Sequence, residues 1–134
     1  MNKILLLAED DDDHYFLCQE AYQEAGLPYP MKRVRDGEEL MEYLLRQGNY
    51  QNEKSEVALI LLDLNMPKKD GREALREIKH KPQLQKIPIV ILTTSKNEED
   101  VMYANELGIM AFVRKPSSFS EFVEFMKSLS NLLI

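Results

Sequence analysis

Residues 59–71 read L-I-L-L-D-L-N-M-P-K-K-D-G, an apolar run that ends at a carboxylate, Asp63. A continuous apolar run of this length is typical of a strand that is buried on both faces of a parallel sheet. A buried carboxylate without a partner is so costly that it usually becomes neutral or finds a compensating group. The position of Asp63 therefore calls for water, an ion or a functional role.

The rest of the chain repeats this apolar pattern. Apolar runs occupy residues 3–8, 31–35, 57–62, 88–93 and 110–114, and amphipathic stretches lie between them. Residues 71–80 and 98–107 carry apolar side chains at three-to-four spacing, which is the period of a helix. A strand and a helix repeated five times predict an α/β fold with a parallel sheet covered on both faces. The alternation in M-K-R-V-R at 31–35 fits an edge strand, and the polar residues 46–56 fit a long surface loop.

The composition limits the class of protein and its partners. With 134 residues, 44% hydrophobic and 30% charged, the chain suits one globular domain over residues 1–134. Its net charge of −6 disfavours nucleic-acid binding, so proteins and cations are the expected partners. We find no signal peptide and no membrane-spanning stretch, and we expect a cytoplasmic protein without a membrane partner. The single cysteine, Cys18, is expected to be a small buried residue.

Polar side chains stand where the predicted strands end. Glu9 and Asp10 follow the first strand, Asp63 follows the third, Thr93 ends the fourth and Lys115 follows the fifth. In open parallel sheets, ligands bind outside the carboxyl ends of the strands, near the point where strand order reverses. Carboxylates gathered there would share a hard divalent ion such as Mg²⁺, and a lysine would neutralise an anion that joins the metal. A site of this kind would explain Asp63.

These residues match a known family. The chain resembles the receiver domain of two-component response regulators over essentially its whole length, through Glu9-Asp10, the block at 63–71, Thr93 and Lys115-Pro116. Within the family it is most similar to the stand-alone regulators that serve bacterial and cyanobacterial phytochromes. That similarity rests on L-T-T-S at 92–95, K-K-D-G-R-E at 68–73 and the polar loop at 46–56. The resemblance implies a flavodoxin-like (βα)5 doubly wound parallel sheet with strand order 2-1-3-4-5.

The resemblance also implies a phosphoryl-transfer role for the matching residues. Asp63 would be the nucleophile that accepts a phosphoryl group from a sensor histidine kinase, which is possibly a phytochrome, and forms an aspartyl phosphate. Mg²⁺ would be held by Glu9, Asp10 and Asp63 and by the main-chain carbonyl of Asn65. Gly71 would let the loop after the third strand turn tightly. The isomer of the bond before Pro116, cis in many receivers, stays open.

A second group of residues would stabilise the phosphoryl group and report its arrival. Thr93 would donate its hydroxyl to the phosphoryl oxygens, and Lys115 would add a positive charge opposite the metal. Movement of Thr93 would let Phe112, which stands where many relatives have Tyr, rotate inward and change the face of helix four, strand five and helix five. We expect a homodimer or a kinase contact on that face, which would include Met110, Phe112, Phe122 and Phe125.

Three other functions share parts of this pattern. A flavodoxin-like nucleotide binder would offer glycines and hydroxyls in its first loop, whereas E-D-D-D-D at 9–13 repels anions. An aspartate-based phosphohydrolase would need a second acid two residues after the nucleophile, and here that residue is Asn65. A degenerate receiver that acts as a phosphorylation-independent interaction module remains the alternative. Because little chain follows the last helix, we expect a single receiver without an output domain. We expect it to catalyse its own phosphorylation and dephosphorylation and not to be a turnover enzyme.

Several polar residues have simpler interpretations. Asp11, Asp12 and Asp13 suit the start of a helix, where acids interact favourably with the helix dipole. His14 and His80 lie in helical stretches without matching metal-ligand partners, and we expect both to be exposed to solvent.

Overall fold

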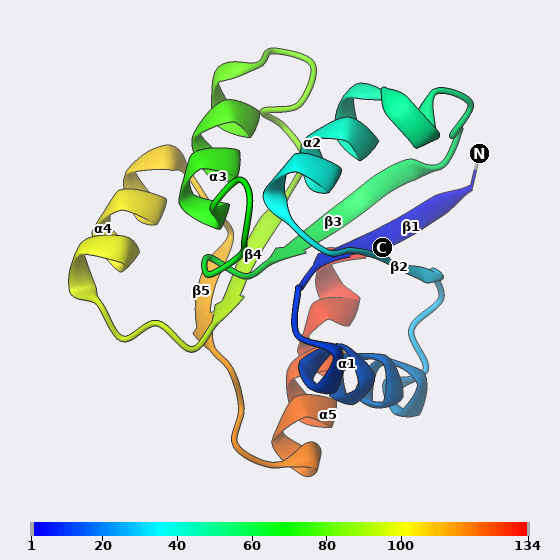
Figure 1. Cartoon of the computed structure of the whole chain (residues 1–134). Helices are drawn as coiled ribbons and strands as arrows, with labels where there is room; N and C mark the ends of the chain where they lie inside the picture. The colour runs from blue at the N-terminus through cyan, green and yellow to red at the C-terminus, as the bar shows by residue number, and fades with distance from the viewer. Residues whose placement is uncertain (1, 134) are drawn as a thin grey trace.

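Each predicted apolar run forms a strand of one parallel sheet in the computed structural model, which describes residues 2–133 (Figure 1). The sheet has the order β2-β1-β3-β4-β5, which confirms the predicted doubly wound topology. The strands are β1 (Lys3–Ala8), β2 (Met31–Val34), β3 (Glu56–Leu62), β4 (Ile89–Thr93) and β5 (Ala111–Arg114). Strand order reverses between β1 and β3, so the carboxyl ends of these two strands form the crevice where such sheets bind ligands.

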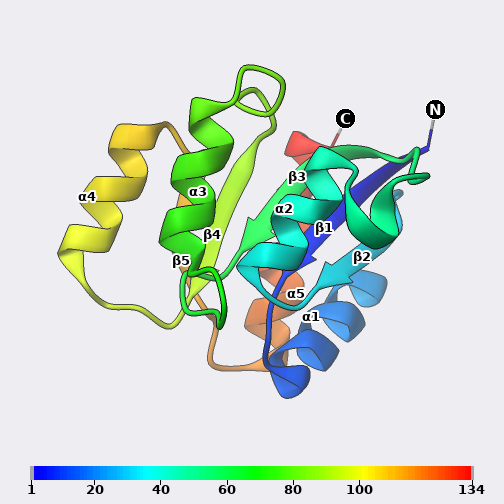
Figure 2. The same ribbon diagram turned by 45° about the horizontal axis from the view of Figure 1, so that its top comes forward.

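Five α-helices cover the two faces of the sheet. They are α1 (Asp12–Ala25), α2 (Gly37–Leu45), α3 (Gly71–His80), α4 (Glu98–Leu107) and α5 (Phe119–Ser128). Figures 1 and 2 show α1 and α5 together on one face and α2, α3 and α4 on the other. Within residues 2–133, no helix combines the length and the apolar character that crossing a bilayer requires.

The apolar run before Asp63 is buried on both sides, as the sequence predicts. Ile60 and Leu62 belong to the core beneath α2 and α3, whereas Leu59 and Leu61 belong to the core beneath α1 and α5. All four side chains are fully buried. Alternate residues of a strand point to opposite faces, so a strand covered on both sides must be apolar at every position. Asp63 thus lies at the carboxyl end of a strand that runs through the centre of the molecule.

The acidic stretch after β1 starts a helix, as expected. Asp11 is the N-cap of α1, and its side chain accepts hydrogen bonds from the main-chain N–H groups of Asp13 and His14. Asp12 and Asp13 occupy the first turn, where negative charge stabilises the exposed N–H end of a helix. Cys18, one turn further on, is buried as predicted.

Residues 46–56 are more ordered than the predicted surface loop. They contain a short 3-10 helix, η1 (Gly48–Tyr50), and the first residue of β3. Arg46 Nη2 donates to the carbonyl of Ser55 at 2.5 Å, and Lys32 Nζ lies 3.3 Å from Glu53 Oε2. Polar composition indicated an exposed segment, but one of these contacts lies within the segment and the other ties it to Lys32 on β2.

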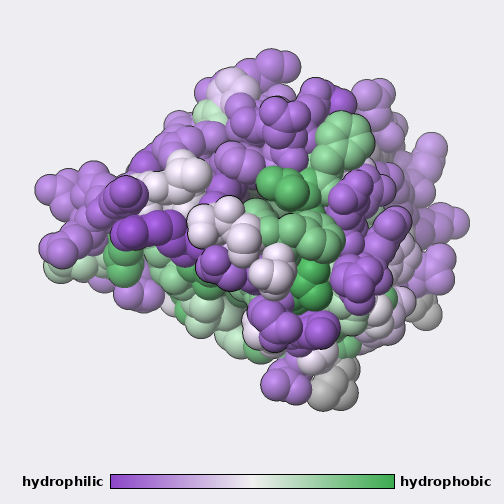
Figure 3. Space-filling model, turned by 90° about the horizontal axis from the view of Figure 1, so that it is seen from below, coloured by the Kyte–Doolittle hydropathy of each residue, from purple (hydrophilic) through white to green (hydrophobic). Residues whose placement is uncertain are grey.

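Phe122 corrects one prediction. Its side chain is only 2% exposed and packs in the core beneath α5, so it cannot belong to a surface face. Among the residues that the structure describes, the most exposed large apolar side chains are those of Phe16, Leu17, Met102, Met110 and Phe119. Figure 3, which views the molecule from the side of α1 and α5, shows apolar side chains gathered among hydrophilic ones at the centre of this face.

Candidate functional site

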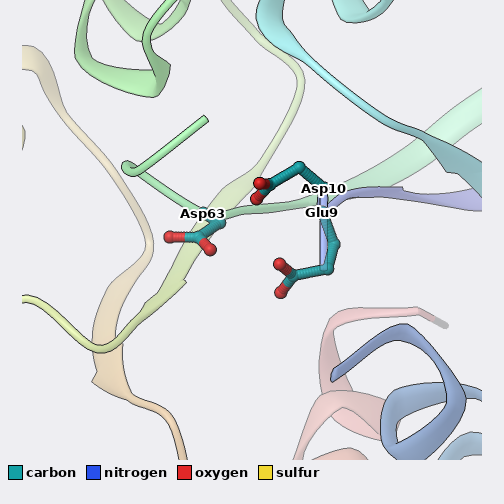
Figure 4. Close-up of side chains that lie close together, drawn as sticks. All are labelled: Glu9, Asp10 and Asp63. Atoms are coloured by element: carbon teal, nitrogen blue, oxygen red, sulfur yellow. The ribbon is translucent and has the colours of Figure 1, made fainter. Parts of the chain in front are cut away.

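Three carboxylates meet at the crevice between β1 and β3. Glu9 and Asp10 follow the last residue of β1, and Asp63 follows the last residue of β3. Each offers an oxygen within 4.8 Å of an oxygen of the others, and Figure 4 shows the three side chains close together. Glu9 and Asp63 are buried, whereas Asp10 is exposed to solvent. Two of these carboxylates are thus buried next to like charges. Only cations and hydrogen-bond donors can compensate the free-energy cost of ionising them there.

Asp63 is the most highly coordinated of the three acids. Its Oδ1 accepts hydrogen bonds from the Thr93 hydroxyl at 2.9 Å and from the main-chain N–H of Asn65 at 3.1 Å. Its Oδ2 accepts a hydrogen bond from Lys115 Nζ at 3.0 Å. These contacts explain how a carboxylate can be buried directly after β3, because Asp63 has hydrogen-bond partners in its own loop, at the end of β4 and in the residue after β5.

Lys115 balances the charge of this cluster. Its side chain is only 5% exposed, and its Nζ lies 2.7 Å from Glu9 Oε1 as well as 3.0 Å from Asp63 Oδ2. Burial by itself would lower the pKa of Lys115, but the hydrogen bond from Lys115 to Glu9 and the charges of Asp63 and Glu9 outweigh it and raise that pKa. Lys115 therefore stays a cation and faces the two buried carboxylates.

Glu9 is the acid most affected by its surroundings. Burial raises its pKa above the ordinary value of 4.5, and the charge of Asp63 acts in the same direction, against the opposing effect of Lys115. One ammonium does not fully compensate two carboxylates in a buried site, so a divalent cation would improve the balance. The oxygen donors of Glu9, Asp10 and Asp63 fit Mg²⁺, because Mg²⁺ prefers carboxylates and retains waters, for which the exposed Asp10 leaves access.

Gly71 fixes the loop that follows Asp63. Its main-chain N–H donates to the carbonyl of Leu64 at 3.0 Å. A Cβ atom at this position would lie 2.3 Å from the carbonyl oxygen of Asp63 and 2.6 Å from the Cα of Leu64. Glycine is required here by the close approach of two backbones, and this contact holds the turn after Asp63 tightly closed.

A second charged network joins the loop after β3 to the loop after β4. Arg72, in the first turn of α3, donates through Nε and Nη2 to the two carboxylate oxygens of Asp100, each at 2.6 Å. Arg72 Nη1 also lies 3.3 Å from the carbonyl oxygen of Leu64. The Ser95 hydroxyl donates to Asp100 Oδ2 at 2.7 Å. The hydrogen bond from Arg72 lowers the pKa of the buried Asp100, so Asp100 stays ionised and holds both loops.

The sequence predicted no such network, although it carries one signal of it. Asp100 is four residues before the buried Ala104 in α4, so it occupies the core-facing side of that helix, where an acid needs a partner. The identity of that partner depends on how α3 and α4 pack. His14 was also misjudged, since it is only partly exposed and its Nδ1 lies 2.9 Å from Lys115 Nζ. His80 is exposed, as expected.

Phe112 and Asn65 lie at the margins of the site. Phe112 is half-buried on β5, where it pairs in register with Ile91 and packs against the core beneath α2 and α3. It does not belong to the acidic cluster. The Asn65 side chain is exposed, and its main-chain N–H faces Asp63. Within residues 2–133 the structure has no cis peptide bond, so the bond between Lys115 and Pro116 is trans.

A doubly wound sheet that gathers acids, a hydroxyl and a lysine at the carboxyl ends of its strands is suited to bind a divalent cation together with an anion. The chain belongs to the family of response regulator receiver domains, whose family model matches residues 5–127. This membership confirms the family that the motifs indicated.

Relatives with known structures support the same assignment. Response regulator Rcp1 from Synechocystis sp. is 40% identical over 129 residues, which are 96% of this chain and 87% of Rcp1. The structure of Rcp1 with bound Mn²⁺ superimposes with a TM-score of 0.87, at 40% identity and with 96% and 92% of the two chains covered. The phosphorylated cyanobacterial phytochrome response regulator RcpA gives a TM-score of 0.89 at 40% identity, with 99% and 94% covered. The similar solved structures thus include a phytochrome response regulator, as expected.

Proposed function

We propose that Asp63 is the phosphoacceptor of a response regulator that serves a sensor histidine kinase. The observation that carries this proposal is the position of the Asp63 carboxylate, which lies between the Thr93 hydroxyl and the Lys115 ammonium and beside Glu9 and Asp10. A carboxylate in this setting is oriented and close to groups that stabilise added negative charge. The structures of Mn²⁺-bound Rcp1 and phosphorylated RcpA support the same chemistry for this chain.

The transfer is a displacement at phosphorus. An oxygen of the Asp63 carboxylate forms the new P–O bond, the P–N bond to the kinase histidine breaks, and the imidazole leaves with the electron pair of that bond. The Thr93 hydroxyl, now donating to Asp63 Oδ1, and the Lys115 ammonium, now donating to Oδ2, are placed to donate to the phosphoryl oxygens. Mg²⁺ held by Glu9, Asp10, Asp63 and the carbonyl of Asn65 would offset the charge of those oxygens.

Intact-mass measurement tests this assignment. We expect the wild-type protein, incubated with Mg²⁺ and a small phosphodonor, to gain one labile phosphoryl group, and Asp63→Asn to gain none, because an amide is a poor nucleophile. Asp70→Asn is a suitable control, since Asp70 caps α3 and lies outside the acidic cluster. Equal labelling of wild type and Asp63→Asn would show that another residue accepts the group.

The partner is proposed to be a histidine kinase of the phytochrome type. The support comes from the similarity to RcpA and to the bacteriophytochrome response regulators RtBRR and AtBRR, which are 39% and 36% identical to this chain. The exposed apolar residues Phe16 and Leu17 lie on α1, the helix that begins beside Glu9 and Asp10. Apolar side chains next to the acceptor suit a protein partner that must bring its histidine to Asp63.

Phosphorylation is proposed to change the face of α4, β5 and α5. A dianion at Asp63 would draw the Thr93 hydroxyl inward and shift the loop before α4, which would let Phe112 rotate. Phe112 lines a groove of about 460 Å³ together with Ser95 and Val101, so there is space beside the ring for a different rotamer. The exposed Met102 and Met110 extend this face, which suits a homodimer or a kinase contact.

In this proposal the protein is a single-domain, cytoplasmic receiver whose output is a protein contact. It catalyses its own phosphorylation and its own dephosphorylation, and it turns over no separate substrate. The alternative of a phosphorylation-independent interaction module is disfavoured, because the complete set of acids, hydroxyl and lysine is assembled with hydrogen-bonding geometry.

A further inference from the structure

We propose that His14 positions Lys115 for phosphoryl transfer and makes the transfer dependent on pH. The inference deepens the proposed function and rests on Asp63 as the phosphoacceptor. It starts from the contact of 2.9 Å between His14 Nδ1 and Lys115 Nζ. His14 lies in the first turn of α1, and Lys115 follows β5, so the fold brings together two residues that are 101 positions apart.

The contact completes the hydrogen bonding of the ammonium. A lysine ammonium has three N–H donors and no acceptor. In the structure Nζ has three partners, namely Glu9 Oε1 at 2.7 Å, Asp63 Oδ2 at 3.0 Å and His14 Nδ1 at 2.9 Å. Because Lys115 is a cation, Nδ1 must be the acceptor, and the neutral imidazole therefore carries its proton on Nε2. Neutral His14 accepts a hydrogen bond from the one N–H of the Lys115 ammonium that does not point at a carboxylate. This contact sets the orientation of the other two N–H groups.

The charges around His14 are of both signs. On its own helix, Asp11 Oδ2 lies 3.9 Å from His14 Nδ1. From the segment after β5, Lys115 contributes a positive charge, and Lys115 in turn holds Glu9 from β1 and Asp63 from β3. On the neighbouring α5, the acid of the first turn, Glu121, bonds to Ser117 and Ser118 instead. His14 is thus placed between a cation and an exposed acid, with part of its side chain open to solvent.

Protonation of His14 removes the acceptor. Histidine is the side chain that ordinarily changes charge between about pH 5 and pH 8. An imidazolium has no lone pair for the ammonium and would place two cations 2.9 Å apart, so His14 must turn away toward Asp11 and solvent. The ammonium then keeps only its two carboxylate partners and is held more firmly against Glu9 and Asp63. A lysine held there obstructs the oxygen that attacks phosphorus, so phosphorylation slows as the pH falls.

Rates of labelling by a small phosphodonor at saturating Mg²⁺, measured from pH 8.0 to pH 5.5, test this positioning role. We expect the wild-type rate to fall about fivefold more than that of His14→Gln, since Gln offers an acceptor that does not titrate. His14→Leu should be slow at every pH and should lack the same part of the pH dependence. His80→Gln, which changes the other histidine of the chain, should keep the wild-type profile.

The protonation state of His14 can be measured without phosphodonor or metal. In ¹⁵N NMR spectra of the metal-free protein at pH 8, we expect His14 to be the Nε2–H tautomer, and Lys115→Met should shift the Nδ1 signal of His14. A His14 ring with its proton on Nδ1, or pH profiles of wild type, Gln and Leu variants that coincide, would overturn the proposal. Failure of the proposed function would look different, since the wild-type protein would then gain no label at any pH.

Discussion

At the scale of single residues, the site is organised around a shortage of positive charge. Lys115 alone is seen to contact both Glu9 and Asp63 among the residues that the structure describes, so one ammonium serves two buried carboxylates. Functional sites commonly contain side chains whose surroundings reduce the stability of the folded protein. Replacing such a side chain often stabilises the fold. Burial, with a smaller contribution from the charge of Asp63, raises the pKa of Glu9 in agreement with that condition.

Glu9→Gln should therefore stabilise the metal-free protein near pH 7. Because burial raises the Glu9 pKa above 4.5, the ionised side chain opposes folding at pH values above its raised pKa. We expect a gain of about 0.5–2 kcal/mol in the free energy of unfolding, measured by urea denaturation. Below pH 4.5 the gain should vanish, because Glu9 is then protonated in the folded and the unfolded protein. A destabilised Glu9→Gln at pH 7 would mean that the Lys115 contact outweighs burial.

Asp10→Ala should abolish the binding of Mg²⁺ in the absence of phosphoryl groups. The cluster offers one carboxylate oxygen each from Glu9, Asp10 and Asp63, and Mg²⁺ gives up its waters reluctantly, so its binding should be weak even in the wild type. Titration with Mg²⁺ followed by NMR shifts of residues near Asp63 measures it. Asp12→Ala, an exposed acid two residues further on, is the matched control and should bind as the wild type does.

At the scale of elements, the site depends on loops that are tied to one another. The loop after β3 and the loop after β4 meet through Arg72 and Asp100, and Ser95 joins them through its hydroxyl. Thr93, which contacts Asp63, lies two residues before Ser95. Any movement of Thr93 must therefore be accommodated by a network that also anchors the first turn of α4.

Asp100→Asn should weaken the fold at neutral pH. The variant keeps the shape of the side chain but removes the charge that pairs with Arg72, so we expect a loss of about 1–3 kcal/mol in the free energy of unfolding. Since the Asp100 pKa is lowered, the wild type has this stabilisation above the ordinary value of 3.8 and loses it as the pH falls through the lower folded value. The difference between the two proteins should thus shrink below about pH 4 in denaturant melts.

Glu99→Gln provides the control for this comparison. Glu99 is the exposed neighbour of Asp100 in the same turn of α4, so its substitution should leave the unfolding free energy nearly unchanged. If Asp100→Asn and Glu99→Gln unfold alike at pH 7, the contact between Arg72 and Asp100 contributes no stability.

The elements differ in how far the sequence predicts them. β3 and α3 were predicted well, because burial on both faces and three-to-four spacing leave a local record in the order of residues. The convergence of Glu9, Asp63 and Lys115 also followed, since parallel strands bring their carboxyl ends to one edge. Contacts between elements, such as the one between His14 and Lys115, leave no such record. They depend on how two elements pack against each other, which the apolar period of a single helix does not specify.

At the scale of the whole molecule, the acidic crevice and the face of α4, β5 and α5 are joined by β4 and β5. Thr93 ends β4, and Phe112 stands on the adjacent β5. Both strands are short, and under the proposed function a change at the acceptor would reach the surface through the loops and the side chains that flank them, without deformation of the sheet.

Sedimentation measures whether this surface responds. We expect the wild-type protein with Mg²⁺ and a stable phosphoryl mimic to self-associate more strongly than without them, and Met110→Ser to reduce that gain. Met110 is 52% exposed immediately before β5, so its loss should not disturb the core. Phe16→Ser on α1 serves as a control for the removal of another exposed apolar side chain. If neither the mimic nor Met110→Ser changes self-association, the face of α4, β5 and α5 is not the dimer interface.

The strand order also has a consequence for biosynthesis. As the chain leaves the ribosome, β2 and β3 can each pair with the completed β1, β4 can pair with β3, and β5 can pair with β4, so every new strand finds its neighbour already made. Lys115 is the last of the site residues to emerge. An unfinished chain would thus hold Glu9, Asp10 and Asp63 together without their ammonium, and the capacity to take a signal should be acquired only when the final strand joins.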